Sequence, residues 1–163
     1  VAIGGGTIRD TILGVKPFWT TDIRYLFVTA IALFLAIILR KRMKKLNNTW
    51  FVFDTLGLAF FTIAGMQKTL TFGFPFWVAI VMGCITGVAG GVIRDVLLNN
   101  EPVILQKEIY AIASVAGGIL YYILLILNFS ITFTVIATFL LIVLIRFVAV
   151  YYHIQLPVLR DED

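Results

Sequence analysis

Five long apolar runs constrain the fold of this chain more than any other feature of its sequence. A helix that crosses a membrane needs about 20 predominantly apolar residues, and each run comes close to that length. The connections between the runs are short and contain Pro, Asn and Gly, so they leave no space for a soluble domain. The sequence therefore predicts an all-α transmembrane protein in a lipid bilayer. The five predicted spans are residues 22–39, 51–71, 75–98, 107–127 and 131–152.

The composition supports a membrane environment and excludes several functions. Hydrophobic residues make up 61% of the chain and charged residues 13%, whereas soluble domains are about half apolar and about a quarter charged. The single cysteine, Cys84, excludes a disulfide framework. The sequence contains no pattern of a nucleophile–base pair, metal cluster or phosphate loop, so we expect no enzyme activity, metal or cofactor. The modest net charge of +4 indicates neither a nucleic-acid partner nor a soluble one.

Basic residues predict how the spans are oriented. The densest cluster of Lys and Arg lies at residues 40–45, and such clusters face the cytoplasm. Counting spans from this cluster puts the C-terminal tail in the cytoplasm as well. Residues 1–15 resemble the second half of a further span that begins before residue 1, so we expect the N-terminus of the complete protein outside. Aromatic residues at the predicted span ends fit interfacial belts; they are Phe18, Trp19, Trp50, Phe76, Trp77, Tyr110, Tyr151 and Tyr152.

A short glycine–Arg–Asp motif occurs twice in the chain. The segment GGGTIRD at residues 4–10 recurs as AGGVIRD at residues 89–95, a shift of 85 residues. Two full spans lie between the helices that carry the two copies, so the copies should have opposite orientations in the membrane. Inverted repeats with glycine-interrupted helices are typical of transporters and channels. At the same shift Leu13 matches Leu98, Pro17 matches Pro102 and Tyr25 matches Tyr110.

The repeat predicts how the chain is divided. Residues 1–46 form a first, incomplete repeat, residues 47–128 a second, inverted repeat, and residues 129–163 a final transmembrane helix with a cytoplasmic tail. The counterpart of the span 51–71 would fall before residue 1, so we infer that the first helix is missing from this chain. The complete protein is then an inverted three-plus-three helix repeat with one additional helix.

The adjacent glycines predict breaks in two helices. Each glycine weakens a helix by about 1 kcal/mol relative to alanine, and a break at Gly4–Gly6 and at Ala89–Gly91 would offer backbone carbonyls to a cation. The alternative is close helix packing, because Gly83, Gly87 and Gly91 form a continuous small face. The residues predicted to line an ion pathway are Gly4, Gly5, Gly6, Thr7, Ala89, Gly90 and Gly91.

Charged residues near the motifs are predicted to form two mouths. Neighbours in sequence do not face each other on a helix, so we expect each charge to need its own partner. Asp54 should reach Arg94 at the cytoplasmic level, and Lys68 should reach Asp10 at the outer level. The alternative is that these charges are solvated at the interfaces. The predicted mouth charges are Arg9, Asp10, Arg94, Asp95, Asp54 and Lys68.

Two other features have simpler interpretations. The only histidine, His153, stands at a predicted helix end beside two tyrosines, so we expect an interfacial side chain. A second small face in the span 107–127 is interpreted as a packing surface. It consists of Ala113, Ser114, Gly117 and Gly118.

The whole chain resembles a known family. The two motifs, the inverted plan and the pattern Asp54-x-x-Gly57…Gly65-x-Gln67-Lys68 are similar to those of prokaryotic trimeric intracellular cation (TRIC) channels. That group overlaps a bacterial membrane family labelled as carrying a glycine transporter domain. The resemblance implies a homotrimer in the prokaryotic inner membrane, with a pore in each subunit around two glycine-kinked helices. It also implies monovalent permeant cations such as potassium.

The leading functional hypothesis is a passive monovalent-cation channel. The resemblance places the kinks at the glycines of the two motifs, and Ala89 in place of a third glycine suggests a stiffer second break. The rival hypothesis is a secondary transporter of a small zwitterion such as glycine, which would need selective side chains. Polarity between the motifs comes mostly from Thr7, Thr62 and Thr86, and this sparse polarity mildly favours the channel. A non-conducting scaffold is disfavoured, because packing does not explain a repeated Arg–Asp pair.

Overall fold

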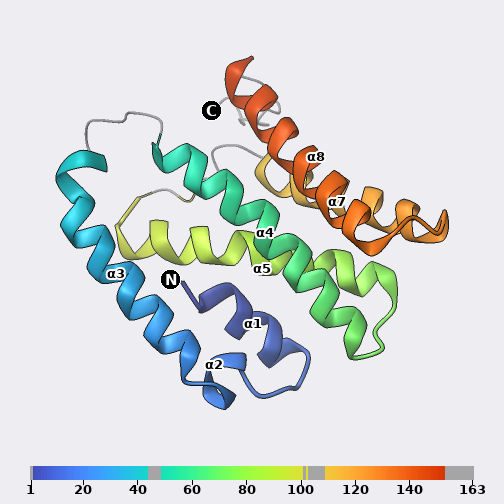
Figure 1. Cartoon of the computed structure of the whole chain (residues 1–163), viewed down its shortest axis with the longest axis horizontal. Coiled ribbons are helices and arrows are strands. Elements are labelled where there is room, and N and C mark those ends of the chain that lie inside the picture. The colour runs from blue at the N-terminus through green and yellow to red at the C-terminus, as the bar shows by residue number, and fades with distance from the viewer. Residues whose placement is uncertain (1, 44–48, 101, 103–108, 153–163) are drawn as a thin grey trace, which may run out of the picture.

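All regular secondary structure in the described part of the chain is helical (Figure 1). The computed structural model describes residues 2–43, 49–100, 102 and 109–152. His153, the C-terminal tail and the side chains of residues 40–50, which include the basic cluster and Trp50, lie outside the described residues. The helices are α1 (Gly4–Ile12), α2 (Phe18–Thr21), α3 (Arg24–Met43), α4 (Thr49–Thr71), α5 (Phe76–Leu97), α7 (Ile109–Ile126) and α8 (Ile131–Tyr151).

The five predicted spans are confirmed as helices. Each predicted run coincides with one of α3, α4, α5, α7 and α8, and the ends differ by only a few residues. Among the described residues, α5, α7 and α8 are long and apolar enough to cross a membrane, and the described apolar part of α3 is shorter. Helix α4 is less apolar because it carries Asp54, Gln67 and Lys68. Two of these polar residues, Asp54 and Lys68, line the candidate site.

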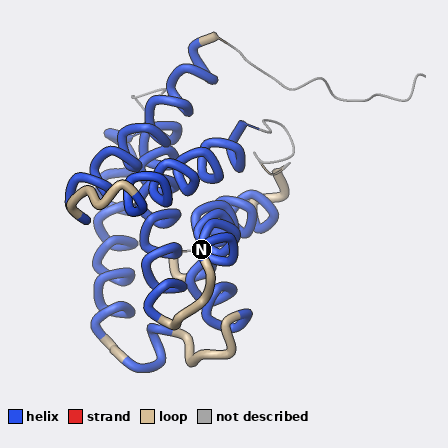
Figure 2. The backbone as a smooth tube through the Cα atoms, turned by 90° about the vertical axis from the view of Figure 1, so that its right-hand side faces the viewer, coloured by secondary structure: helices blue, strands red, loops and turns tan. Residues whose placement is uncertain are grey.

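Helices α4 and α5 form the centre of the bundle. They pack along each other, with α7 and α8 on one side and α1 against α5 on the other (Figure 1). The side view shows the same bundle of helices (Figure 2). Helix α3 stands apart, contacts chiefly α2, and has no buried side chain among its described residues. Its apolar surface therefore faces lipid or another protein chain.

Small residues bring α4 and α5 into close contact. A Cβ atom added at Gly83 would lie 2.5 Å from Cγ of Met66 and 2.7 Å from the carbonyl oxygen of Thr62. One added at Gly87 would lie 2.7 Å from Oγ1 of Thr62. Side chains larger than that of glycine do not fit at these distances. The interpretation of Gly83 and Gly87 as packing residues is confirmed.

The small face of α7 is likewise confirmed as a packing surface. Gly117 lies directly against the side chain of Ile142 on α8, so that an added Cβ would overlap it. Ser114 accepts a hydrogen bond of 3.0 Å from Oγ1 of Thr62 on α4. Both Ser114 and Thr62 are fully buried. This hydrogen bond satisfies two polar groups that would otherwise be costly in an apolar interior.

The predicted break in α5 is wrong. Helix α5 is uninterrupted from Phe76 to Leu97 and passes through Ala89–Gly91. It packs against α1, α4 and α7, and such contacts outweigh a helix penalty of about 1 kcal/mol per glycine. In an apolar environment, intrahelical hydrogen bonds are also the simplest way to satisfy the backbone. In the first copy, Gly4–Gly6 form the first turn of α1.

The repeat is visible in the backbone. Helix α1 ends at Ile12 and α5 at Leu97, a difference of 85 residues. The turn that follows has a left-handed residue in both copies, with φ of 70° at Gly14 and 54° at Asn99. Three equivalent backbone hydrogen bonds end both helices. In the first copy they are Leu13 N–Arg9 O (2.9 Å), Gly14 N–Thr11 O (3.1 Å) and Val15 N–Asp10 O (2.9 Å). In the second copy they are Leu98 N–Arg94 O (3.0 Å), Asn99 N–Val96 O (3.1 Å) and Asn100 N–Asp95 O (2.9 Å). In Figure 1, α1 and α5 run in opposite directions.

Candidate ion pathway

A cavity of about 620 Å³ is lined by residues from both copies of the motif and from one face of α4. The α4 residues fall in adjacent pairs or singly, with successive groups three or four positions apart, so they lie on one broad face of that helix. At about 1.5 Å per residue, the face from Asp54 to Lys68 is about 21 Å long. These α4 residues include Asp54, Gly57, Phe61, Ala64 and Lys68, and the motif helices add Gly5, Gly6, Arg9, Thr86, Gly87, Gly90, Gly91 and Arg94.

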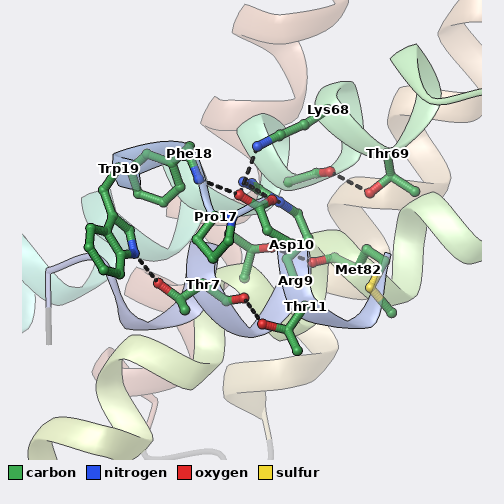
Figure 3. Close-up of polar contacts among 12 residues, drawn as sticks. Thr7, Arg9, Asp10, Thr11, Pro17, Phe18, Trp19, Lys68, Thr69 and Met82 are labelled. Atoms are coloured by element: carbon green, nitrogen blue, oxygen red, sulfur yellow. Dashed lines mark hydrogen bonds and ion pairs between the residues drawn. The ribbon is translucent and has the colours of Figure 1, made fainter. Parts of the chain in front are cut away.

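One end of the cavity is formed by the Asp10 cluster, which consists of Asp10, Arg9, Lys68 and the start of α2 (Figure 3). Oδ1 of Asp10 accepts a hydrogen bond of 2.8 Å from Nε of Arg9. Oδ2 accepts from Nζ of Lys68 at 2.8 Å and from the backbone N–H of Phe18 at 2.9 Å. Asp10 is fully buried and Arg9 is 5% exposed. The carboxylate therefore joins α1, α2 and α4 at one point.

The other end is formed by the Asp54 cluster, which consists of Asp54, Arg94, Asp95, Tyr110 and Arg146. Oδ1 of Asp54 accepts from Nη1 of Arg94 at 3.0 Å and from the hydroxyl of Tyr110 at 3.2 Å. Oδ2 accepts from Nη2 of Arg146 at 3.4 Å. One carboxylate thus joins α4, α5, α7 and α8. The prediction that Tyr110 belongs to an interfacial belt is wrong, because this side chain is buried and bonded to Asp54.

The two predicted ion pairs are confirmed, one in each cluster. Asp54 and Arg94 are 3.0 Å apart, and Asp10 and Lys68 are 2.8 Å apart. The expectation that neighbouring charges do not pair with each other is wrong, because each arginine also pairs with the aspartate that follows it. Nε of Arg94 lies 2.8 Å from Oδ1 of Asp95, as Nε of Arg9 does from Asp10. The long stem and five donors of arginine let its guanidinium fold back onto an adjacent carboxylate.

The cavity does not include every residue predicted for the pathway. Gly4, Thr7 and Ala89 are not among its lining residues, although Gly5, Gly6, Gly90 and Gly91 are. The hydroxyl of Thr7 accepts a hydrogen bond of 3.0 Å from the indole of Trp19 on α2 (Figure 3). Of the predicted mouth charges, Arg9, Asp54, Lys68 and Arg94 line the cavity. Asp10 and Asp95 do not line the cavity. They form ion pairs with Arg9 and Arg94, which do.

Arg146 is the site residue that the sequence analysis missed. It is 2% exposed, and its guanidinium lies over the rings of Tyr110 at 4.5 Å and Phe51 at 5.4 Å. The signal in the sequence was a lone arginine inside the apolar run that forms α8. An ionisable residue within a membrane span is a functional candidate by default. That signal was overlooked because α8 lies outside the repeat.

These features define a class: a polytopic helical membrane protein with a repeated glycine–Arg–Asp motif around a cavity between two ion-pair clusters. The chain belongs to the family described as glycine transporter, which matches residues 1–41 and 51–125. It is 41% identical over 160 residues to a UPF0126 membrane protein of Vibrio cholerae, covering 96% of this chain and 66% of that relative. It is 39% identical over 171 residues to the inner membrane protein YadS of Escherichia coli, covering 99% of this chain and 80% of YadS.

The predicted resemblance to TRIC channels is confirmed by solved structures. A TRIC cation channel superposes with a TM-score of 0.85 at 29% identity, covering 99% of this chain and 80% of that chain. The TRIC trimeric intracellular cation channel orthologue from Rhodobacter sphaeroides gives a TM-score of 0.80 at 30% identity, covering 93% and 79%. The chain therefore has the fold of this family. It spans about two thirds of the length of the Vibrio cholerae relative.

Proposed function

We propose that this protein is a passive monovalent-cation channel whose path follows the face of α4 between the Asp10 cluster and the Asp54 cluster. The observation that carries the proposal is a cavity lined by glycines of both motif copies and by charged residues of both clusters. Similar structures are described as cation channels, one of them trimeric. By this likeness the protein acts as a homotrimer with one pore in each subunit. It resides in the inner membrane, with potassium as the leading permeant ion and the C-terminus in the cytoplasm.

The dimensions of the cavity support a path across the membrane. The α4 face between Asp54 and Lys68 is about 21 Å long, against a hydrocarbon thickness of about 30 Å. Between its charged ends this face carries no charged residue, and the glycines leave backbone exposed to the cavity. Because α5 is uninterrupted, its carbonyls stay in intrahelical hydrogen bonds, and the glycines contribute space to the proposed path.

The rival function is transport of a small zwitterion such as glycine. The name of the matching family favours this rival. The geometry favours the channel, because the charged ends of the cavity are about 21 Å apart and one glycine molecule cannot contact both. Each charged residue that lines the cavity is also already in an ion pair. A zwitterion site would need free charges only a few ångströms apart.

Single-channel recording of the full-length protein in planar bilayers tests the proposal. We expect stepwise currents carried by potassium and sodium, and no saturable uptake of labelled glycine into liposomes. Gly57→Leu should reduce the current, because an added Cβ at Gly57 meets no atom within 4 Å and a larger side chain would extend into the cavity. The matched control is Ala32→Leu on the exposed surface of α3, which should leave the current unchanged. Saturable glycine uptake without currents would overturn the proposal in favour of the transporter.

A further inference from the structure

We infer that Arg146 sets the electrostatic potential that a cation meets at Asp54 and thereby tunes the preference of the pore for cations over anions. The inference rests on the proposed channel function and adds a residue from outside the repeat to it. Arg146 does not line the cavity. It acts on the cavity through its ion pair with Asp54. Arg146 is therefore a positioning residue, and its charge partly offsets the negative charge of that carboxylate.

Asp54 is the residue through which the Asp54 cluster presents negative charge to the cavity. Among the described residues it is the one carboxylate that lines the cavity, where the other charged lining residues are Arg9, Lys68 and Arg94. Its Oδ1 is engaged by Arg94 and Tyr110, and its Oδ2 is engaged by Arg146. The negative charge that a permeating cation meets at this carboxylate is therefore set by two guanidinium groups.

The surroundings of Arg146 make its charge effective over a distance. The side chain is 3% exposed, and its guanidinium lies over the rings of Tyr110 and Phe51. Its Nε has no hydrogen-bond partner among the described residues. A charge held away from water is screened less than a charge at the surface. A neutral side chain would be enough to anchor α8. A buried guanidinium paired with the carboxylate that lines the cavity also acts on the potential there.

The two arginines of the Asp54 cluster are balanced by its two carboxylates. Arg94 and Arg146 contribute two positive charges, and Asp54 and Asp95 contribute two negative charges, so these four side chains sum to zero. Arg146→Gln would leave them with one net negative charge. By Coulomb's law, one unit charge acting across about 10 Å of water changes the local concentration of a monovalent ion by about twofold.

Reversal potentials in a potassium chloride gradient measure this effect. Arg146→Gln should raise the ratio of potassium to chloride permeability by about twofold or more at about 0.1 M salt. The change should shrink at about 1 M, where the Debye length is only about 3 Å. Arg146→Lys keeps the charge and should preserve the wild-type ratio. The control is Arg24→Gln, which removes a positive charge from a side chain that is 85% exposed.

A second pair of variants avoids an unbalanced charge in a buried position. Asp54→Asn should lower the permeability ratio, and Arg146→Gln added to Asp54→Asn should raise it again, because the four side chains return to zero net charge. This comparison decides the matter if Arg146→Gln alone does not fold. An unchanged ratio in Arg146→Gln, or an equal ratio in Asp54→Asn with and without Arg146→Gln, would overturn the inference. A wild-type protein that passes no current would instead overturn the proposed function.

Discussion

The two copies of the motif end their helices in the same way but use α4 in opposite ways. In the first copy the aspartate of the motif, Asp10, forms an ion pair with Lys68 of α4. In the second copy the arginine of the motif, Arg94, forms an ion pair with Asp54 of α4. The backbone that follows each copy is the same, down to the left-handed residue. The repeat therefore determines where each arginine–aspartate pair is held. Helix α4, which supplies Lys68 to one copy and Asp54 to the other, determines what each pair binds.

The largest difference in stability is expected between variants of the two motif aspartates, Asp10 and Asp95. Asp10→Asn would leave both Arg9 and Lys68 without their carboxylate, and loss of one partner of a buried ion pair costs about 3–5 kcal/mol. Asp95→Asn should leave Arg94 better compensated than Asp10→Asn leaves Arg9, because Arg94 keeps Asp54. Thermal inactivation followed by size-exclusion chromatography in detergent measures the difference. Equal losses in the two variants would show that α4 does not distinguish the copies.

The next effect concerns coupling within the Asp54 cluster. Asp54→Asn leaves two guanidinium groups without their shared carboxylate, while Asp54→Asn combined with Arg94→Gln leaves one. A double-mutant cycle between Asp54 and Arg94 should therefore give a coupling free energy of about 0.5–3 kcal/mol, with the double variant more stable than the sum of the single changes predicts. Additive losses in the same thermal assay would contradict a direct pair.

Equivalent glycines in the two copies should also respond differently to alanine. A Cβ at Gly6 would lie 2.5 Å from the ring of Phe18, whereas one at its counterpart Gly91 would lie 3.2 Å from the hydroxyl of Tyr110. Gly6→Ala should destabilise the fold by about 1–3 kcal/mol through overpacking. At Gly91→Ala the better helix propensity of alanine, about 1 kcal/mol, offsets the tighter contact. Identical melting temperatures of the two variants would contradict this.

The smallest effect is expected at the turns that close the two helices. Gly14 and Asn99 are equivalent left-handed residues, and asparagine tolerates this conformation better than other side chains. Gly14→Asn should therefore cost less than about 1 kcal/mol, and Asn99→Gly should be close to neutral. Gly14→Val, with its branched side chain, serves as the destabilised control. A large loss in Gly14→Asn would show that the two turns are not equivalent.

The sequence predicted the helices well because each depends on a local run of apolar residues. It predicted the ion pairs well because the inverted repeat shows which charges share a depth in the membrane. Apolar runs of membrane length locate the spans, and opposite charges at the same depth predicted Asp54–Arg94 and Asp10–Lys68 correctly. The break in α5 was predicted wrongly, because helix propensity is a local quantity and the packing around Gly87 is not. Arg146 was missed because it lies on a helix outside the repeat and its partner, Asp54, is 92 residues away in the chain. No pattern in the sequence joins those two positions.

The opposite charges at the two ends of α4 have a consequence for the direction in which this helix can pack in the bundle. If α4 were threaded in the reverse direction, Lys68 would lie against Arg94, and Asp54 would lie against Asp10. Each contact would bring like charges together where water cannot screen them well. The same two residues that stabilise the folded bundle therefore disfavour the reversed packing of α4. Asp54 and Lys68 fix the direction in which α4 lies between the two clusters.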